Sequence, residues 1–183
     1  LSLTVIGAQA FAFDGYEDRR GVFVGLCLGG GLGGVDVEDA NDATGLDNTP
    51  AVGLHADAAL GTGITRNLGA SVQGKIWIRT VKLNDFALRH QHFSLLPTLD
   101  YFIFDGIHFS IGAGLAYATF DTVRDETDTY LYREMGFAAK LGTVFEFFAN
   151  GTIAAGVQLG YTHHIYAHGD FNTLTGGVRL RWY

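Results

Sequence analysis

The feature that most constrains this chain is a regular alternation of apolar residues with polar or small ones. It is clearest over residues 173–183, where Leu174, Val178, Leu180 and Trp182 share one parity. Successive side chains of a β-strand point to opposite faces, so this segment predicts a strand with one apolar face. The opposite parity of the same strand carries Thr175, Gly177, Arg179 and Arg181.

The same alternation returns in seven other segments of the chain. No run of 18 apolar residues exists to cross a membrane as a helix, yet nearly half of the residues are apolar. Strands with one lipid-facing and one lumen-facing side have this composition, so we predict an all-β, eight-stranded antiparallel up-and-down transmembrane β-barrel. The seven other predicted strands cover residues 21–33, 51–61, 67–80, 92–104, 107–117, 130–148 and 152–166.

The connections between these segments are expected to differ at the two ends of the barrel. One rim is predicted to carry short turns, at residues 62–66, at Asp105-Gly106 and at 149–151. The other rim is predicted to carry four longer loops, because the segments between those strands are mostly polar. The four predicted loops are residues 35–50, 81–91, 121–129 and 167–172.

The C-terminal strand also resembles the assembly signal in the closing strand of bacterial outer-membrane barrels. The matching positions are Thr175, Gly177, Leu180 and Trp182, and Tyr183 after the final aromatic is a departure from the pattern. With this strand, residues 21–183 resemble the small eight-stranded outer-membrane proteins of Gram-negative bacteria. That superfamily includes the OmpA membrane domain, OmpX, OmpW and the porin-family surface proteins, and no motif selects one member.

This resemblance implies a place in the bacterial outer membrane and a set of partners. The expected partners are outer-membrane lipid and lipopolysaccharide, the barrel-assembly machinery, and envelope or surface proteins that contact the loops. The net charge of −7 gives no general attraction to nucleic acid, and none is predicted as a partner.

The first twenty residues are predicted to lie outside the barrel. Residues 1–10 have the character of a signal-peptide remnant, with Ala8-Gln9-Ala10 as a cleavage box, and residues 11–20 form a polar periplasmic lead-in. An N-terminal strand or plug is the alternative for residues 1–10. Cys27 is the only cysteine, so no disulfide forms within the chain.

The lumen parity of the predicted strands carries charges of both signs. An eight-stranded barrel is only wide enough for side chains to fill, and buried charges are costly unless they are paired. We therefore expect a salt-bridged, largely plugged lumen, with a narrow pore in which the pairs rearrange as the alternative. The predicted network comprises Asp57, Lys75, Arg79, Asp100, Glu134, Lys140, Glu146, Arg179 and Arg181.

Three histidines on the lumen parity, His55, His92 and His164, are each expected toward the loop end of a strand. Imidazoles gathered at one rim could bind a transition metal or respond to pH. Unrelated histidines scattered over the rim are the alternative. A calcium site in the acidic residues 35–50 is a minor alternative, because their spacing does not match an EF-hand.

The sequence argues against several enzymatic functions. Residues 29–34 match G-x-G-x-x-G, but an acidic segment follows where a dinucleotide-binding fold needs a helix. Lipid A deacylase barrels are similar in size and carry a His-x-Ser pair on a late strand. Here neither His163 nor His164 is followed by serine two positions later, and no nucleophile–base pair is evident.

We therefore predict a protein that is not an enzyme and needs no cofactor. Its expected role is structural and in surface interactions. The alternative is a narrow porin-like channel for small or hydrophobic solutes, and a lipid A-modifying enzyme is the third hypothesis.

Overall fold

A computed structural model describes residues 21–36, 51–83, 86–104, 106–124, 127–149 and 152–183. These residues form eight strands, as predicted. The strands are β1 (Gly21–Asp36), β2 (Ala51–Gly63), β3 (Leu68–Leu83), β4 (Phe86–Phe104), β5 (Ile107–Arg124), β6 (Thr127–Ala149), β7 (Ile153–Tyr166) and β8 (Gly169–Trp182).

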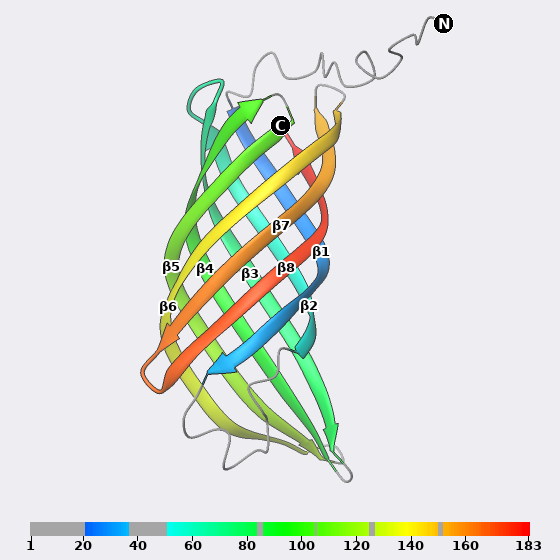
Figure 1. Ribbon diagram of the computed structural model, residues 1–183, viewed down its shortest axis with the longest axis vertical. Coiled ribbons are helices and arrows are strands. Elements are labelled where there is room, and N and C mark those ends of the chain that lie inside the picture. The colour runs from blue at the N-terminus through cyan, green and yellow to red at the C-terminus, as the bar shows by residue number, and fades with distance from the viewer. Residues whose placement is uncertain (1–20, 37–50, 84–85, 105, 125–126, 150–151) are drawn as a thin grey trace, which may run out of the picture.

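Each strand pairs antiparallel with the next, and β1 pairs antiparallel with β8, so the sheet closes into a barrel (Figure 1). The closing pair places Gly29 opposite Gly177 and Gly30 opposite Gly176. A closed barrel has no free sheet edge, and every strand finds backbone partners on both sides. The predicted fold class is confirmed.

The barrel has an apolar outside and a polar inside. On β2, Val52 and Leu54 are 77% and 74% exposed, whereas His55 and Asp57 are 3% and 5% exposed. The same alternation continues around the barrel, and it is the arrangement of a membrane barrel rather than a soluble one. Within the described residues, no helix has the length and hydrophobicity of a transmembrane segment.

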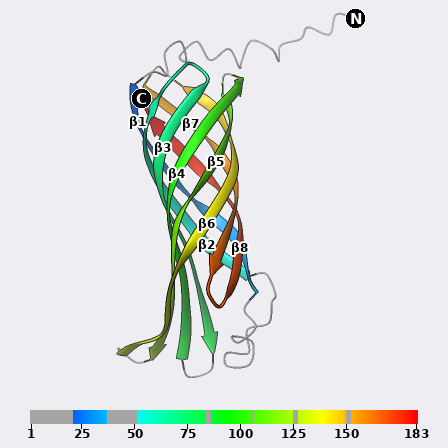
Figure 2. The same cartoon turned by 90° about the vertical axis from the view of Figure 1, so that its left-hand side faces the viewer.

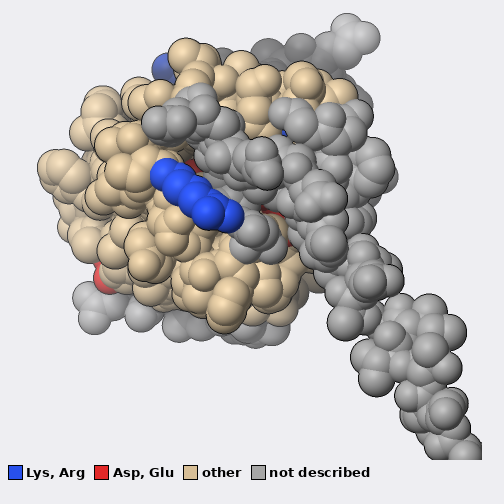
Figure 3. All heavy atoms as spheres, turned by 90° about the horizontal axis from the view of Figure 1, so that it is seen from above, with Lys and Arg blue, Asp and Glu red and all other residues tan. Residues whose placement is uncertain are grey.

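The turn rim has the short connections that the sequence predicts. β4 ends at Phe104 and β5 begins at Ile107, so the tight turn at residues 105–106 is confirmed. Gly106 has a φ of 91°, a conformation that favours glycine because other residues carry a Cβ. Seen from this rim, the described surface is mostly uncharged, with basic side-chain atoms near its centre (Figure 3).

The prediction of long loops at residues 81–91, 121–129 and 167–172 is wrong, because the strands continue into these segments. Backbone pairing extends along the β3–β4 hairpin as far as Leu83 and Phe86. Once a strand has left the bilayer it needs no apolar face, so the alternation ends while the pairing continues. The residues that separate the strands at these three places are only 84–85, 125–126 and 167–168.

The long strands make the loop rim uneven. β3, β4, β5 and β6 extend well beyond the β7–β8 hairpin and form a paired extension on one side of this rim (Figures 1 and 2). The predicted signal peptide and lead-in, and most of the predicted loop 35–50 with its calcium alternative, lie outside the described residues.

Irregularities in the strand pairing modify the barrel wall. Pairing between β4 and β5 is interrupted between Leu95 and Thr98, where Pro97 has no backbone N–H to donate. A register shift after Phe102 turns Phe104 outward, where it is 67% exposed. Strict alternation would place Phe104 in the lumen with Phe102, and the register shift places it on the outer wall instead.

Candidate functional site

The barrel interior contains three layers of polar and aromatic side chains. The turn-end layer is built around Arg181 of β8, which is 1% exposed. Its guanidinium donates to Asp100 Oδ2 at 2.9 Å and lies 3.8 Å from Glu146 Oε1. The same guanidinium approaches His108 Nε2 at 3.3 Å. One buried cation therefore joins β4, β5 and β6 to β8 across the lumen.

Aromatic rings cover the Arg181 guanidinium. Its carbon lies 4.4 Å from the centre of the Phe23 ring, and the rings of Phe102 and Tyr183 are each 5.8 Å away. Cation–π attraction strengthens when water is excluded, so these rings stabilise the buried charge. This layer brings together three residues of the predicted charge network: Asp100, Glu146 and Arg181.

The middle layer contains Asp57, Gln73, Lys75, Lys140, Gln158 and Arg179. Gln158 links two of the predicted charges, because its Nε2 donates to Asp57 Oδ2 at 2.8 Å and its Oε1 accepts from Arg179. His55 Nε2 lies 3.2 Å from the same Asp57 oxygen. The carboxylate of Asp57 is therefore contacted by an amide and an imidazole.

The two lysines of the middle layer have neutral partners. Lys75 Nζ donates to Thr162 Oγ1 at 2.6 Å and to Thr175 Oγ1 at 3.3 Å, and Lys140 Nζ donates to Gln73 Oε1. No carboxylate of the described residues lies within 4.0 Å of either ammonium group. With Arg179 in the same layer, basic groups outnumber the single acid, Asp57.

One group of side chains has the spacing of a metal site. Ligand atoms of Cys27, His55 and Asp57 all lie within 4.8 Å of one another, and the three side chains are buried. A thiolate, an imidazole and a carboxylate are ligands that zinc accepts. The neighbouring Lys75 and Arg179 would repel a divalent cation, so the electrostatics of the middle layer disfavour this use.

The loop-end layer contains Trp77, His90, His92, His164 and Phe171. His92 stacks on Phe171 with 3.6 Å between ring centres, and it hydrogen-bonds to Tyr166 Oη at 2.8 Å and to His90 Nε2. The centres of the His92 and His164 rings are 5.3 Å apart. Two of the three predicted rim histidines therefore lie together, His90 joins them, and His55 lies apart beside Asp57.

Two members of the predicted charge network lie at the loop end, away from the other charges. Glu134 Oε1 accepts from the backbone nitrogen of Ala167 at 2.7 Å and contacts His168 Nδ1 at 3.1 Å. Glu134 therefore holds the β7–β8 connection to β6. Arg79 is 7% exposed and lies beyond Trp77 on β3.

No protein-family model matches the chain, and no curated protein sequence matches it. Solved structures do match. Ail, the attachment invasion locus protein of Yersinia pestis, is 10% identical with a TM-score of 0.63, over 87% of this chain and 98% of that chain. The structure of Ail in complex with the heparin analogue sucrose octasulfate also gives 0.63, at 9% identity, over 88% and 99% of the two chains.

Neisserial surface protein A is a third similar structure. It is 12% identical, with a TM-score of 0.56, over 86% of this chain and 95% of that chain. The chain has the fold of the small outer-membrane β-barrels. This fold and the apolar exterior confirm the prediction of an eight-stranded outer-membrane barrel. At these identities the likeness concerns the fold alone.

The seam of this outer-membrane barrel contains the predicted assembly residues. Thr175 is buried in the lumen, and Leu180 is 38% exposed on the outer wall. Gly177 lies where β8 meets β1: a Cβ there would be 2.5 Å from the backbone oxygen of Leu28 and 2.9 Å from Cys27 Sγ. The close approach of the two strands therefore requires glycine at position 177. Trp182 pairs with Val24 and Ile153 at the turn rim.

The barrel also contains a serine–histidine pair that the sequence did not reveal. Ser94 Oγ lies 3.0 Å from His164 Nε2, and His164 Nδ1 lies 3.2 Å from the backbone oxygen of Phe171. The sequence-based statement that no nucleophile–base pair is evident is thus corrected, because residues 70 positions apart meet across the lumen. Both side chains are buried, at 6% and 2% exposure, which denies the pair access to a substrate.

Proposed function

We propose that this chain is a non-catalytic barrel of the bacterial outer membrane that presents its loop rim to partners and keeps its lumen closed. The observation that carries the proposal is the paired extension of β3 to β6 beyond the β7–β8 hairpin. A barrel that only anchored the chain would need strands no longer than the bilayer requires. The additional paired backbone of β3 to β6 offers a stable surface outside the bilayer.

The connection between β1 and β2 at the same rim indicates which partners suit the loop end. Residues 35–50 contain five acidic residues and no lysine or arginine. A basic or neutral partner is favoured over a polyanion for this reason. A heparin-like ligand, which the comparison structure of Ail carries, is not expected for this chain, whose net charge is −7.

The three interior layers support a closed lumen. The largest fully buried side chains come from all three layers. They include Arg181 of the turn-end layer, Lys140 of the middle layer, and Trp77 and Phe171 of the loop-end layer. Eight strands leave an interior just wide enough to be filled in this way. Ions passing along the axis would have to displace each of these side chains in turn.

The test is the single-channel conductance of the refolded protein in a planar bilayer. The wild-type protein is expected to show no conductance steps. If the middle layer is the barrier, Lys140→Ala should show reproducible conductance steps. Folding is checked by the altered gel mobility of unboiled protein. Frequent conductance steps in wild type would contradict the closed lumen.

The presentation of the loop rim needs its own test. Proteoliposomes that carry wild type should adhere to surfaces coated with a basic polypeptide more than to surfaces coated with an acidic one. A variant in which the five acids of residues 35–50 are replaced by their amides should lose that preference. Equal adhesion of wild type to both surfaces would refute the proposed partner chemistry.

A narrow channel is the second candidate, and one observation favours it. Lys75, Lys140 and Arg179 outnumber Asp57 in the middle layer, which would attract small anions into the lumen. If wild type conducts, the reversal potential in a potassium chloride gradient should therefore indicate a preference for chloride. A preference for potassium would exclude the middle layer as the selective element.

A further inference from the structure

The outer wall of the barrel over β3 to β8 has two neighbouring apolar grooves. The alanine groove, of about 670 Å³, is bordered by Ala70, Pro97, Ala113 and Ala139. The glycine groove, of about 590 Å³, is bordered by Phe109, Gly142, Leu159 and Gly160. Both grooves are open along the lipid-facing wall.

A single ridge separates the two grooves. The ridge consists of Leu99, Ile111, Leu141 and Tyr161, which border both grooves and are cross-strand neighbours in register from β4 to β7. The alanine groove reaches Ala70, two residues after the start of β3 at the turn rim. The grooves therefore run side by side across the wall and meet at Tyr161.

A polar cluster lies at this meeting point, on a wall made mostly of apolar side chains. Tyr161 Oη donates to Asn172 Oδ1 at 2.6 Å, and His163 Nδ1 donates to the same oxygen at 2.7 Å. His163 Nε2 lies 3.5 Å from Asp170 Oδ2, with the two side chains 33% and 46% exposed. Four polar side chains gathered on the lipid-facing side of the wall are a candidate binding site.

The height of the cluster fits a lipid headgroup. His163 precedes Ala167, at the β7–β8 connection, by four residues, which is about 10 Å along the axis of a tilted barrel. The cluster therefore lies near the loop-side surface of the bilayer. The grooves lead from it toward the turn side, as the acyl chains of a lipid lead from its headgroup.

The cluster also indicates the chemistry of the headgroup. Asp170 offers carboxylate acceptors, and the Asn172 amide retains its donors because only its oxygen is engaged. Hydroxyl groups both donate and accept, so they can satisfy both residues. A phosphate would meet the Asp170 carboxylate with no lysine or arginine in the cluster to offset the repulsion.

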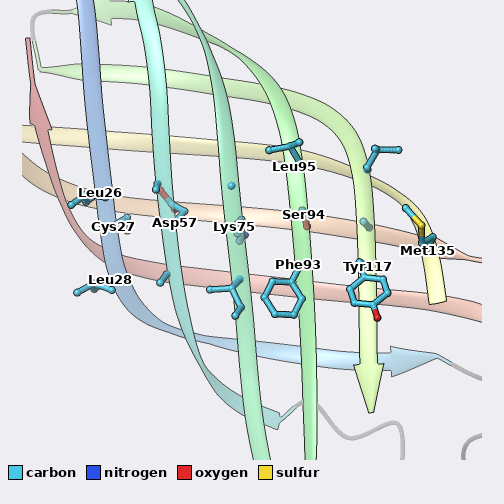
Figure 4. A pocket seen from close by; sticks show the side chains of 16 residues that line it. Leu26, Cys27, Leu28, Asp57, Lys75, Phe93, Ser94, Leu95, Tyr117 and Met135 are labelled. Atoms are coloured by element: carbon cyan, nitrogen blue, oxygen red, sulfur yellow. The ribbon is translucent and has the colours of Figure 1, made fainter. Parts of the chain in front are cut away.

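We propose that the outer wall binds one two-chain glycolipid, with an acyl chain in each groove and a hydroxyl-rich headgroup on Tyr161, His163, Asp170 and Asn172. This site does not depend on whether the lumen conducts. The groove over β1 to β6 in Figure 4, between Leu26, Leu28 and Leu95, is a comparison site on the same molecule. It is apolar and is not bordered by these four residues.

The experiment is native mass spectrometry of the complete chain, folded in detergent and mixed with lipids of matched acyl chains. The probes are a glucosyl diacylglycerol, phosphatidylglycerol and a single-chain glucosyl lipid. Wild type is expected to retain one glucosyl diacylglycerol in preference to the other two. Asp170→Asn should weaken retention about fivefold, because one charged acceptor oxygen is replaced by an NH2 donor. Ala139→Leu should weaken it about tenfold by filling the alanine groove.

The matched control is Ala58→Leu, which adds the same volume to the comparison groove and should leave retention unchanged. Gel mobility selects the folded fraction of each variant. Equal retention of phosphatidylglycerol would overturn the headgroup assignment, and equal retention of the single-chain lipid would overturn the use of two grooves. Equal losses in Ala139→Leu and Ala58→Leu would overturn the location.

Discussion

Removal of the Arg181 charge is the most direct test of the turn-end layer. Arg181→Met keeps much of the side-chain volume but leaves Asp100 and Glu146 as buried carboxylates without their cation, which is 2.9 Å and 3.8 Å away in wild type. Removing one partner of a buried ion pair costs about 3–5 kcal/mol, and lost cation–π contact with Phe23 adds about 0.5–2 kcal/mol. We therefore expect Arg181→Met to lower the free energy of unfolding by at least about 3 kcal/mol.

The assay is equilibrium urea unfolding in lipid vesicles, followed by tryptophan fluorescence and by gel mobility. The double variant Arg181→Met/Asp100→Asn should be less destabilised than the sum of the two single variants, because it removes a buried charge that Arg181→Met leaves without its cation. Val52→Met, at a position 77% exposed on the outer wall, is the control and should change stability by no more than about 0.5 kcal/mol. A loss below about 1 kcal/mol for Arg181→Met would refute the argument that this buried ion pair stabilises the barrel.

Three further outcomes follow from the described contacts. Gly177→Ala should lower the yield of heat-modifiable barrel in a refolding assay, because the added Cβ would meet the Leu28 backbone oxygen. Gly176→Ala is the control and should refold normally, since its nearest contact would be 3.3 Å away. Equal yields of the two variants would contradict this reasoning. Cys27, 1% exposed, should resist a maleimide in folded protein and react after boiling, and rapid labelling before boiling would disprove its burial. Phe171→Ala should lower the free energy of unfolding in urea by about 3–5 kcal/mol, because Phe171 is buried in the lumen. Leu174→Ala, on the exposed outer wall, should lower it less, and the reverse order would argue against the assignment of Phe171 to the packed interior.

Alternation alone was sufficient to predict the barrel and most of its faces. The strands inside the bilayer must place apolar residues outward at every second position, so Leu174 and Val178 could be assigned to the wall, and Arg179 and Arg181 to the lumen. Where the bilayer constraint ends, the prediction failed. The outer part of the β3–β4 hairpin pairs through its backbone, and backbone pairing leaves no pattern in the sequence.

The interior contacts were harder to predict than the identity of the interior residues. Parity indicates that His92 and His164 face the lumen, but only strand register and tilt determine that His92 meets His90 and that Ser94 meets His164. Parity likewise grouped Glu134 with the lumen charges, although it bonds to the backbone at Ala167. The outer cluster around His163 was missed because its partners come from both strands of one hairpin.

The seam between β1 and β8 has a consequence for how the molecule is made. Gly29 and Gly177 are neighbours in space, yet nearly the whole barrel sequence separates them. Until β8 is in place, β1 has an unpaired edge that could join another chain. The barrel therefore cannot close before the last strand has been synthesised, because β1 pairs with β8. A partner that shields the free edge of β1 until then would protect the unfinished sheet from aggregation.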